Sequence, residues 1–418
     1  MPLPLAAPLA IAVVGAGPVG LALALHAARM LPAARITLYD ARPADLDVAG
    51  DPRTIALSLG SVQLLERLGA WDAKAAQPIV EVRISQQPPT ARLFGRDVEL
   101  RIRARDEGVP LLGAVLAHGR IVAPLQAAWL EAVQREPQRL QARFGTAVRA
   151  LKDLAAGVEI DAGIAEAYDL AVVAEGGVFA DVQHTLGPAG RRHWRHDYRQ
   201  TAWVGQVTLE REHGGTAWER FTRYGPAALL PLPRGAAGAP QTALVWCVAR
   251  DDDPVAELTD AQRLAVLDTV FPAEVGPLVA ITPLKAFPLG LHAERSLVGH
   301  AGDASAAGTR PRVVRIGNAA QKLHPVAGQG LNLGLRDAVA LVHALDAAGP
   351  AVDAALRRVE WQRAPDRLSM IAATDFLARS FTWVLPGAGL ARGLGLAALQ
   401  ALGPARSLLA RQMMFGMR

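Results

Sequence analysis

The chain has 418 residues, of which 51% are hydrophobic, and its formal net charge is +5 at neutral pH. This length suits two intertwined domains, and the composition excludes a disordered or fibrous chain. The charge excess lies in residues 376–418, which hold five arginines and no acidic residue, so we expect no nucleic-acid-binding face spread over a domain.

Residue usage excludes several other classes of protein. The single cysteine, Cys247, cannot form an intramolecular disulfide, and its apolar neighbours favour a buried hydrophobic role over a nucleophilic one. The first ten residues contain three prolines and no basic residue, so no signal peptide is predicted. No uncharged apolar run reaches about 18 residues, so we predict no transmembrane helix. The histidines show no metal-binding spacing, and we expect no metal.

The chain begins with a strand–helix–strand unit built around a glycine motif. The pattern predicts a buried strand at 9–14, a helix at 18–31 and a second strand at 35–40. Gly15 permits a tight turn, Gly17 lets the backbone approach a pyrophosphate, and Gly20 lets the helix pack on the strand. Asp40 ends the second strand, where it can accept hydrogen bonds from ribose hydroxyls. We therefore predict dinucleotide binding, the alternative being a purely structural turn.

The middle of the chain alternates between helical and strand patterns. Leu57, Leu64, Leu65 and Leu68 recur at helical spacing, which predicts a helix that ends near Gly69. The elements predicted next are short strands within 78–115, a helix at 123–135, a strand at 168–174, antiparallel strands within 200–250, a helix at 259–271, strands near 281–287 and 295–300, and a polar loop at 302–310. The first domain is thus left and re-entered twice, so we expect the second domain to consist of insertions.

A second glycine-rich segment, GNAAQKLHPVAGQGLNLGLRDA, follows a predicted strand at 312–316. A residue before proline is pushed toward an extended form, so His324-Pro325 is expected to end an extended segment. Gly328 and Gly330 carry no side chain, which lets the backbone contact a flat ring. The alternative is an ordinary glycine-rich loop that caps a helix.

The helix expected after this loop continues to about 346, and further helices are predicted at 350–380 and 387–413. The amides of Leu331 and Asn332 lie at the predicted helix start, where free N–H groups favour an anion. The N1/O2 edge of a reduced flavin is such an anion. The second motif therefore indicates that the dinucleotide is FAD.

The segment RIGNAAQKLHPVAGQGLNLGLRD resembles the second flavin-binding motif of the single-component FAD-dependent aromatic hydroxylases, which have the para-hydroxybenzoate hydroxylase fold. The segments DPRTIALSLGSVQLLERLGAW, WERFTRYGPAALLPLP, FPLGLHAERS and ATDFLARSF are similar to the branch that acts on polyprenyl phenols in ubiquinone biosynthesis. The resemblance covers nearly the whole chain. The FAD motifs are specific to the superfamily, and the other segments point to the branch.

The resemblance carries cofactor contacts over to individual residues. It implies that FAD meets Gly15, Gly17, Gly20, Asp40, Arg53, Gln126, Glu175, Gly317, Asn318, Gly328, Gly330, Leu331 and Asn332, with Pro325 beside the ring. Arg53 has a surface ion pair as its alternative role. Asn318 stands where the broader family has aspartate, and its amide oxygen can accept the same hydrogen bond.

Two positions depart from the family pattern. Glu175-Gly176 replaces the usual Asp-Gly, and the extra methylene moves the carboxylate, which puts a nicotinamide-handling role in doubt. The segment before Gln126 is shorter than in the family, which weakens the implied flavin contact. His324 has two open roles: it is either a general base for a phenol proton or a side chain that satisfies loop carbonyls, and we favour the second.

The apolar and arginine-rich tail has two open roles as well. It either lies on an anionic membrane surface or packs on the FAD domain with a basic outer face, and a bilayer-soluble substrate favours the membrane slightly. We expect a cytoplasmic location, with peripheral contact to the inner membrane left open. A quinone-biosynthesis protein complex is a further candidate partner.

The expected fold class is α/β: a Rossmann-like FAD domain, an inserted antiparallel β-sheet substrate domain and C-terminal helices. The predicted boundaries give 1–75, 116–184 and 288–375 to the FAD domain, 76–115 and 185–287 to the substrate domain, and 376–418 to the basic tail. These boundaries place the substrate beneath the antiparallel sheet.

The resemblance implies a monooxygenase that hydroxylates a 2-polyprenyl-6-methoxyphenol through a flavin C4a-hydroperoxide. Its cofactor would be FAD, and its co-substrates O₂ and NAD(P)H. The cofactor carries the chemistry, while the protein excludes water and orients the ring. Three alternatives remain: a sister hydroxylase acting at another ring position, an FAD-dependent prenyl reductase, and a non-catalytic FAD-binding scaffold of the quinone-synthesis assembly.

Overall fold

A computed structural model describes residues 8–88, 92–93, 96–174, 193–235, 238–301, 309–380 and 387–417. Its first sheet has six strands in the order β10-β2-β1-β14-β22-β21. These strands are β1 (Ala10–Val14), β2 (Arg35–Asp40), β10 (Leu140–Phe144), β14 (Leu170–Val173), β21 (Val298–Gly299) and β22 (Val313–Arg315). All neighbours except β21 pair in parallel, as expected of a sheet whose two faces are both covered.

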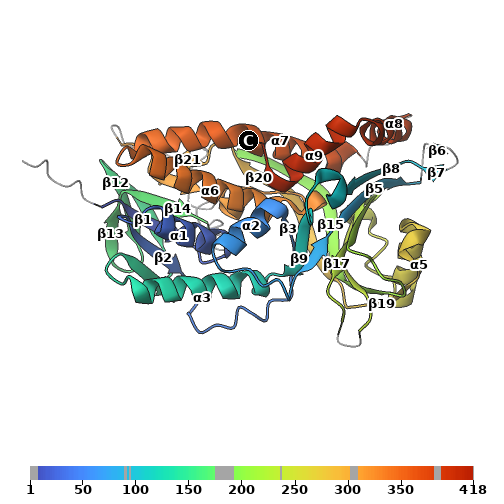
Figure 1. The fold of residues 1–418 in the computed structure, drawn as a ribbon, viewed down its shortest axis with the longest axis horizontal. Coiled ribbons are helices and arrows are strands. Elements are labelled where there is room, and N and C mark those ends of the chain that lie inside the picture. The colour runs from blue at the N-terminus through green and yellow to red at the C-terminus, as the bar shows by residue number, and fades with distance from the viewer. Residues whose placement is uncertain are drawn as a thin grey trace, which may run out of the picture.

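The two faces of this sheet meet different layers. Alternate residues such as Ile11 and Val13 pack against α1 (Pro18–Met30), α3 (Gly119–Arg135), α6 (Gly330–Ala348) and α7 (Val352–Ser380). The intervening Ala12 and Val14 pack on a small antiparallel sheet of β11 (Ala150–Leu154), β12 (Gly157–Asp161) and β13 (Ala165–Tyr168). Figure 1 shows these layers on the side of the molecule that holds the N-terminus. The period-two alternation of a strand thus builds both cores.

The second large sheet is mostly antiparallel. Its order is β23-β20-β15-β18-β17-β16-β5-β8, with β19 paired to β15. The strands are β5 (Glu81–Gln87), β8 (Glu99–Arg103), β15 (His193–Leu209), β16 (Thr216–Thr222), β17 (Gly225–Leu232), β18 (Gln241–Ala249), β19 (Leu278–Ile281), β20 (Lys285–Glu294) and β23 (Gln321–Lys322). The helix α5 (Asp260–Val270) covers its outer face, as Figure 1 shows.

Smaller elements complete the fold. A three-stranded sheet of β3 (Thr54–Ser58), β9 (Gly113–Ala117) and β4 (Gln77–Ile79) lies between the two large sheets. The helix α2 (Leu59–Arg67) directly follows β3 in the sequence. A two-stranded ribbon joins β6 (Arg92–Leu93) to β7 (Arg96–Asp97). The α/β fold class is confirmed. The domain boundaries stay a prediction, although β20 runs across the one expected at 287/288.

Several predicted elements are wrong at their ends. Leu57 belongs to β3, and the helix after it begins at Leu59, because β9 pairs with this segment and a lone apolar repeat cannot reveal that. The strand expected at 281–287 is two strands, and the one at 295–300 shrinks to β21. The helix predicted at 387–413 is two helices, α8 (Ala388–Ala401) and α9 (Gly403–Phe415). The break precedes Pro404, whose missing N–H suits the first turn of a new helix.

The two tail helices pack through one face and expose the other. Ala410 and Met414 are buried against Leu100 and Ile102 of β8, with Leu396 packed beside them. The outer side keeps four leucines exposed: Leu390, Leu394, Leu402 and Leu408. None of the described helices combines the length and apolar character needed to cross a bilayer.

Candidate functional site

The first glycine loop joins β1 to α1. Gly15 has φ +103°, and its N–H donates to the Tyr39 carbonyl at 2.8 Å. A Cβ on Gly20 would lie 1.9 Å from the Gly15 oxygen, so only glycine lets α1 start this close to the strand. Gly17 begins the helix, and a Cβ there would meet no atom within 4 Å. The loop therefore offers open space directly before a helix N-terminus.

Asp40 braces this loop from the end of β2. Its Oδ2 accepts from the Ala16 N–H at 2.5 Å, and its Oδ1 accepts from Arg42 Nε at 3.0 Å. Arg42 in turn donates to the Ala16 carbonyl at 2.7 Å. The observed contacts of Asp40 thus hold the shape of the glycine turn, and its contact with a ribose stays a prediction.

The second glycine loop lies beside the first because α6 crosses α1 closely. A Cβ on Gly334 would lie 2.7 Å from Gly317 Cα and 2.9 Å from Val19 Cγ2, so a larger residue would push the helices apart. Gly328 has φ +58°, and a Cβ on Gly330 would meet nothing within 4 Å. Asn318 is exposed at the same edge, after β22. Two helix starts about 300 residues apart in sequence are therefore brought close together by the contact between α1 and α6.

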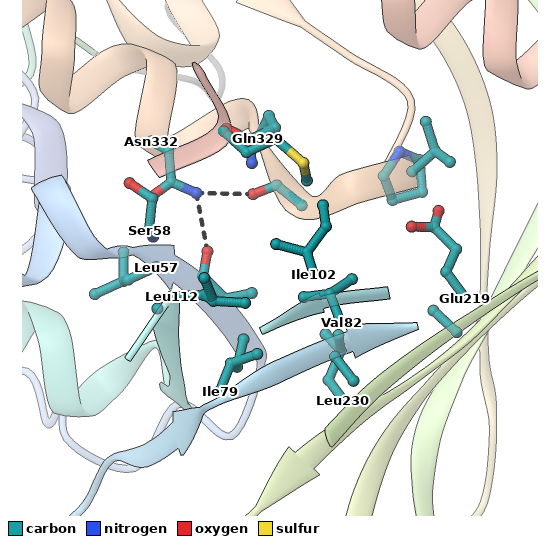
Figure 2. A pocket seen from close by; sticks show the side chains of 18 of the residues that line it. Leu57, Ser58, Ile79, Val82, Ile102, Leu112, Glu219, Leu230, Gln329 and Asn332 are labelled. Atoms are coloured by element: carbon teal, nitrogen blue, oxygen red, sulfur yellow. Dashed lines mark hydrogen bonds between the residues drawn. The ribbon is translucent and has the colours of Figure 1, made fainter. Parts of the chain in front are cut away.

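Asn332 ties the second loop to β3 and α2. Its Oδ1 accepts from Ser58 N and Ser61 Oγ, both at 2.8 Å. Its Nδ2 donates to the carbonyls of Ala56 and Gly328, both at 3.0 Å (Figure 2). The side chain is 1% exposed and uses every donor and acceptor it has. This amide positions the start of α6, whose backbone the sequence assigns to the flavin.

The His324 ring is hydrogen-bonded to the second glycine loop and to β15. Its Nδ1 accepts from Val326 N–H at 3.2 Å, so Nε2 carries the proton and donates to Gln200 Oε1 at 2.9 Å. Burial lowers its pKa to about 4, so the ring is neutral at physiological pH. The ring thus bonds to a loop amide and to a side chain of β15, whereas the expected contacts were loop carbonyls, so the structural role also stays a prediction. The general-base role stays a prediction and has no observed contact with the cavity described below.

Replacing His324 by glutamine is expected to flatten the pH dependence of stability. The folded pKa lies below the ordinary 6.5, so stability is complete above pH 6.5 and is lost as pH falls toward 4, where the unfolded chain binds a proton that the folded chain refuses. In His324→Gln the slope between these values should be lower by up to about 1.4 kcal/mol per pH unit. Urea unfolding at several pH values measures it. Burial also lowers the pKa of His26 to about 4, so the variant should keep the part of the pH dependence that His26 contributes. Equal slopes of stability against pH in the variant and the wild type would contradict the assignment to His324.

The remaining predicted residues lie at different depths. Arg53 is largely exposed and pairs with Asp51 at 2.6 Å, and this hydrogen-bonded arginine lowers the pKa of Asp51 to about 2. Gln126 is buried in α3 and donates to the Ala44 carbonyl at 3.0 Å. Leu331 packs on the main core. Glu175 lies outside the described residues.

A cavity of about 130 Å³ lies between the second loop, the nine-stranded sheet and α9, and we call it the ring cavity. Pro325, Gly328 and Asn332 form its loop side. Its other walls include Ile79, Val82, Ile102, Leu112, Ala228, Leu230, Val245, Cys247, Ala410, Met413 and Met414. Figure 2 shows apolar side chains around most of this space. Pro325, which the sequence places beside the flavin ring, therefore borders an apolar chamber.

Known proteins similar to this chain share its length and architecture. A family model described as an FAD binding domain matches residues 285–372. Ubiquinone hydroxylase UbiL of Rhodospirillum rubrum is 32% identical over 388 residues, which cover 89% of this chain and 82% of that protein. The 3-demethoxyubiquinol 3-hydroxylase of Escherichia coli is 31% identical over 414 residues, covering 95% and 96%. The chain belongs to the FAD-dependent hydroxylases of ubiquinone biosynthesis.

Solved structures place this hydroxylase in the same fold as other flavoproteins. The p-nitrophenol 4-monooxygenase PnpA of Pseudomonas putida superposes with a TM-score of 0.70 at 17% identity, covering 98% of this chain and 99% of that one. HpxO of Klebsiella pneumoniae, solved with FAD and uric acid, has a TM-score of 0.64 at 16% identity, covering 96% and 97%. The likeness confirms the predicted fold. The chain is a flavin-dependent monooxygenase with FAD as its cofactor.

The hydroxylase has room for FAD where the sequence expects it. The positions before α1 and α6 are open in front of Gly17 and Gly330, and each lies at a helix N-terminus that favours an anion. A Cβ on Gly328 would lie 3.4 Å from the Ala56 Cβ, so the glycine keeps the loop close to β3. The residues present therefore fit a long dinucleotide that carries a pyrophosphate in its middle and a planar, anionic ring at one end.

Sequence reasoning missed one residue of the hydroxylase site, Glu219. It is the one carboxylate among the described residues that line the ring cavity, and Figure 2 shows it turned from the sheet toward that space. Burial, and to a lesser degree Glu219, raises the pKa of Cys247 above its ordinary range, so that thiol stays protonated. The alternation along β16 could have singled out Glu219, because Ala217 and Phe221 lie on the same face of the strand and are buried.

Proposed function

We propose that this hydroxylase oxygenates the ring of a 2-polyprenyl-6-methoxyphenol. The observation that carries the proposal is the ring cavity. This apolar chamber borders the loop that we assign to the flavin, and one carboxylate lines it. A phenol presents an apolar ring and one hydroxyl, so this lining matches its chemistry. The two relatives named above, whose names refer to ubiquinone and to a ubiquinol, support the same substrate class.

In this proposal the bound FAD supplies the reactive oxygen, drawn from O₂, and the chain supplies the surroundings. Gly15, Gly17 and Gly20 hold the pyrophosphate, and the amides of Leu331 and Asn332 hold the anionic edge of the ring. Asp40, Arg53, Gln126, Glu175, Gly317, Asn318, Gly328 and Gly330 are proposed as further cofactor contacts. The apolar walls exclude water, which protects a reactive oxygen donor.

Glu219 is proposed to accept the proton of the substrate hydroxyl. A phenol that gives its proton to a carboxylate keeps the electron pair on its oxygen, which makes the ring more electron-rich and more readily attacked by an electrophilic oxygen. The position of Glu219 on the sheet, opposite the loop, would place the hydroxyl away from the flavin and the ring carbons toward it. We propose NAD(P)H as a transient reductant, since the sequence has one G-x-G-x-x-G motif and FAD would occupy it.

The experiment uses purified enzyme reconstituted with FAD, NADPH and a short-chain methoxyphenol under labelled O₂. One labelled oxygen atom in the product is expected, and product without label would contradict the proposal. Glu219→Gln keeps the size of the side chain and should lower kcat by about 100-fold or more, the usual share of an acid–base group. An unchanged kcat would remove Glu219 from the reaction while leaving the oxygenation itself intact.

Hydroxylation at another ring position is the second candidate. The Escherichia coli relative, at 31% identity, is a 3-demethoxyubiquinol 3-hydroxylase, and this named ring position supports the candidate. Mass and nuclear magnetic resonance analysis of the product from each defined precursor would distinguish the positions. The precursor with the higher kcat/KM identifies the natural one.

We also propose that the tail contacts a bilayer, and the support is the exposed side of α8 and α9. Leu390, Leu394, Leu402 and Leu408 are all more than half exposed, and no acidic residue follows Asp375 in the sequence. Such a face fits an anionic lipid surface. Sedimentation with anionic vesicles but not with neutral ones is expected. A quinone-biosynthesis complex stays a prediction, tested by the elution size of the enzyme from a cell extract.

A further inference from the structure

The ring cavity is too small for the whole proposed substrate. Its volume of about 130 Å³ is close to that of a cavity that holds one benzene ring. A ring with an isoprenoid chain needs several times this space, in the range of ordinary ligand pockets. If the ring is oxygenated beside Pro325, the chain must continue into another part of the molecule. The residues that form the walls of the cavity indicate the direction in which the chain leaves.

One wall residue, Met414 of α9, also borders a second cavity of about 600 Å³. We call this second cavity the outer groove; α2, α6, α7 and the end of α9 form it. Met414 is 3% exposed and so fills the boundary between the two spaces. Methionine is unbranched and adapts its rotamers at little cost, which suits a boundary that must admit a flexible chain. Among the described residues, Met414 is the one that lines both cavities.

The outer groove offers apolar surface on part of its wall. Val339 of α6 and Phe415 of α9 are half-buried there, the 83% exposed Trp361 stands at its side, and Leu64 and Leu335 lie buried beneath it. An isoprenoid chain has no polar atoms, so it gains free energy from this contact and asks for no hydrogen bond. The surface of the groove is thus matched to a hydrocarbon that arrives from the ring cavity.

The cations of the groove do not make it an anion site. Arg336 is paired with Asp366 at 2.9 Å, and Arg363 bridges Asp337 and Asp366, both at 2.7 Å. Their charges are balanced inside the protein, and the acids that balance them are 0% exposed. Arg67 of α2 and Arg358 of α7 also line the groove and are exposed, so they can meet solvent or lipid headgroups. The part of the groove beside Arg336 and Arg363 therefore favours a neutral chain.

The end of α9 is held firmly, so a passage between the cavities requires a side chain to move and not the helix. The Met417 N–H donates to Asp366 Oδ1 at 2.9 Å, and a Cβ on Gly416 would lie 2.5 Å from Arg336 Nη1. A Cβ on Gly60 of α2 would lie 2.9 Å from the Met414 carbonyl, which shows how closely the two helices approach. Rotation of the Met414 side chain is the smallest change that joins the two spaces.

We propose that the isoprenoid chain of the substrate passes Met414 and lies in the outer groove between α2, α6, α7 and α9. This inference rests on the proposed function, because it takes its ligand from there. It adds a second binding site for the same substrate and gives α9 a direct part in substrate selection by chain length. The groove opens beside Trp361, so a long chain would emerge at the outer surface of α7.

The first test is photolabelling of the FAD-loaded wild-type enzyme. The probe is a 2-prenyl-6-methoxyphenol with a long chain whose last isoprene unit carries a diazirine. Irradiation followed by peptide mass analysis should place the label on the groove segments of α6 and α7 that contain Val339 and Trp361. Label confined to the β-sheet or to α5 would overturn the proposal. This readout needs binding but no turnover, so it separates the groove from the proposed reaction.

The second test compares chain lengths in a blocked groove. Val339→Trp fills the groove on α6 and should lower the ratio of kcat/KM for the long-chain substrate to that for a single-isoprene substrate by at least about tenfold. Val266→Trp, a matched change on the exposed side of α5, should keep the wild-type ratio. An unchanged ratio in Val339→Trp would overturn the groove. If the wild-type enzyme turned over neither substrate, the proposed function itself would be contradicted.

Discussion

Replacing Gly330 by aspartate is expected to give a folded protein that no longer retains FAD. A Cβ at this position meets no atom within 4 Å, so the new side chain causes no clash within the chain. An aspartate in the first turn of α6 also suits the helix dipole, so the helix should form. The carboxylate would, however, stand in the space assigned to the anionic edge of the flavin. Repulsion and bulk should weaken FAD binding by about 100-fold or more.

The measurement for Gly330→Asp is the ratio of flavin to protein after purification, with circular dichroism and urea unfolding to establish the fold. Gly395→Asp is the matched control, because Gly395 also starts from open space in a helix but lies in α8, away from both glycine loops. The control should remain yellow. A Gly330→Asp protein that keeps a full complement of FAD would show that the flavin edge does not meet the start of α6.

Replacing Asn332 by leucine is expected to be the most destabilising single change in the site. The amide is 1% exposed and makes four hydrogen bonds, to Ser58, Ser61, Ala56 and Gly328. Leucine has nearly the same shape but leaves these buried partners unpaired, and each such group costs about 1–3 kcal/mol. We expect the free energy of unfolding to fall by about 3–5 kcal/mol, allowing for partial relaxation.

Urea unfolding of the FAD-free protein measures this loss without a contribution from cofactor binding. Asn332→Asp is the informative companion, because its carboxylate can still accept from Ser58 and Ser61 but has no donor for the Ala56 and Gly328 carbonyls. Asn318→Leu is the control for stability, since Asn318 is exposed and its loss should stay within about 0.5 kcal/mol. Stability of Asn332→Leu within about 1 kcal/mol of wild type would show that the tie between β3 and α6 is not needed.

Local features of the site were predictable because their physical causes are local. Gly15 and Gly20 allow a turn and a close helix start that any residue with a Cβ would prevent, and six consecutive letters reveal this. The open helix start at Gly330 follows in the same way from its neighbours in sequence. The βαβ unit at the N-terminus matches its predicted bounds closely, since a buried strand and an apolar helix each carry their own period.

Other features depended on partners that are distant in sequence. Leu57 looked helical beside Leu64 but belongs to β3, because β9 supplies the hydrogen bonds that make it a strand. Glu219 alternates into the ring cavity on β16, and only the position of the second loop opposite that strand makes the carboxylate a candidate group. No periodicity in β16 indicates what faces it.

The order of amino acids alone specifies the dinucleotide loop, the flavin loop and, through resemblance, the family. Each depends on residue types within a short span, where backbone geometry decides the outcome. The tertiary structure alone shows that Asn332 bonds to β3, that His324 bonds to Gln200 of β15 and that Met414 separates the ring cavity from the outer groove. These are long-range packing results, because β3, β15 and α9 each reach the site from a distant part of the sequence. Burial and cavities belong to such assembled surfaces, and no short stretch of sequence encodes them.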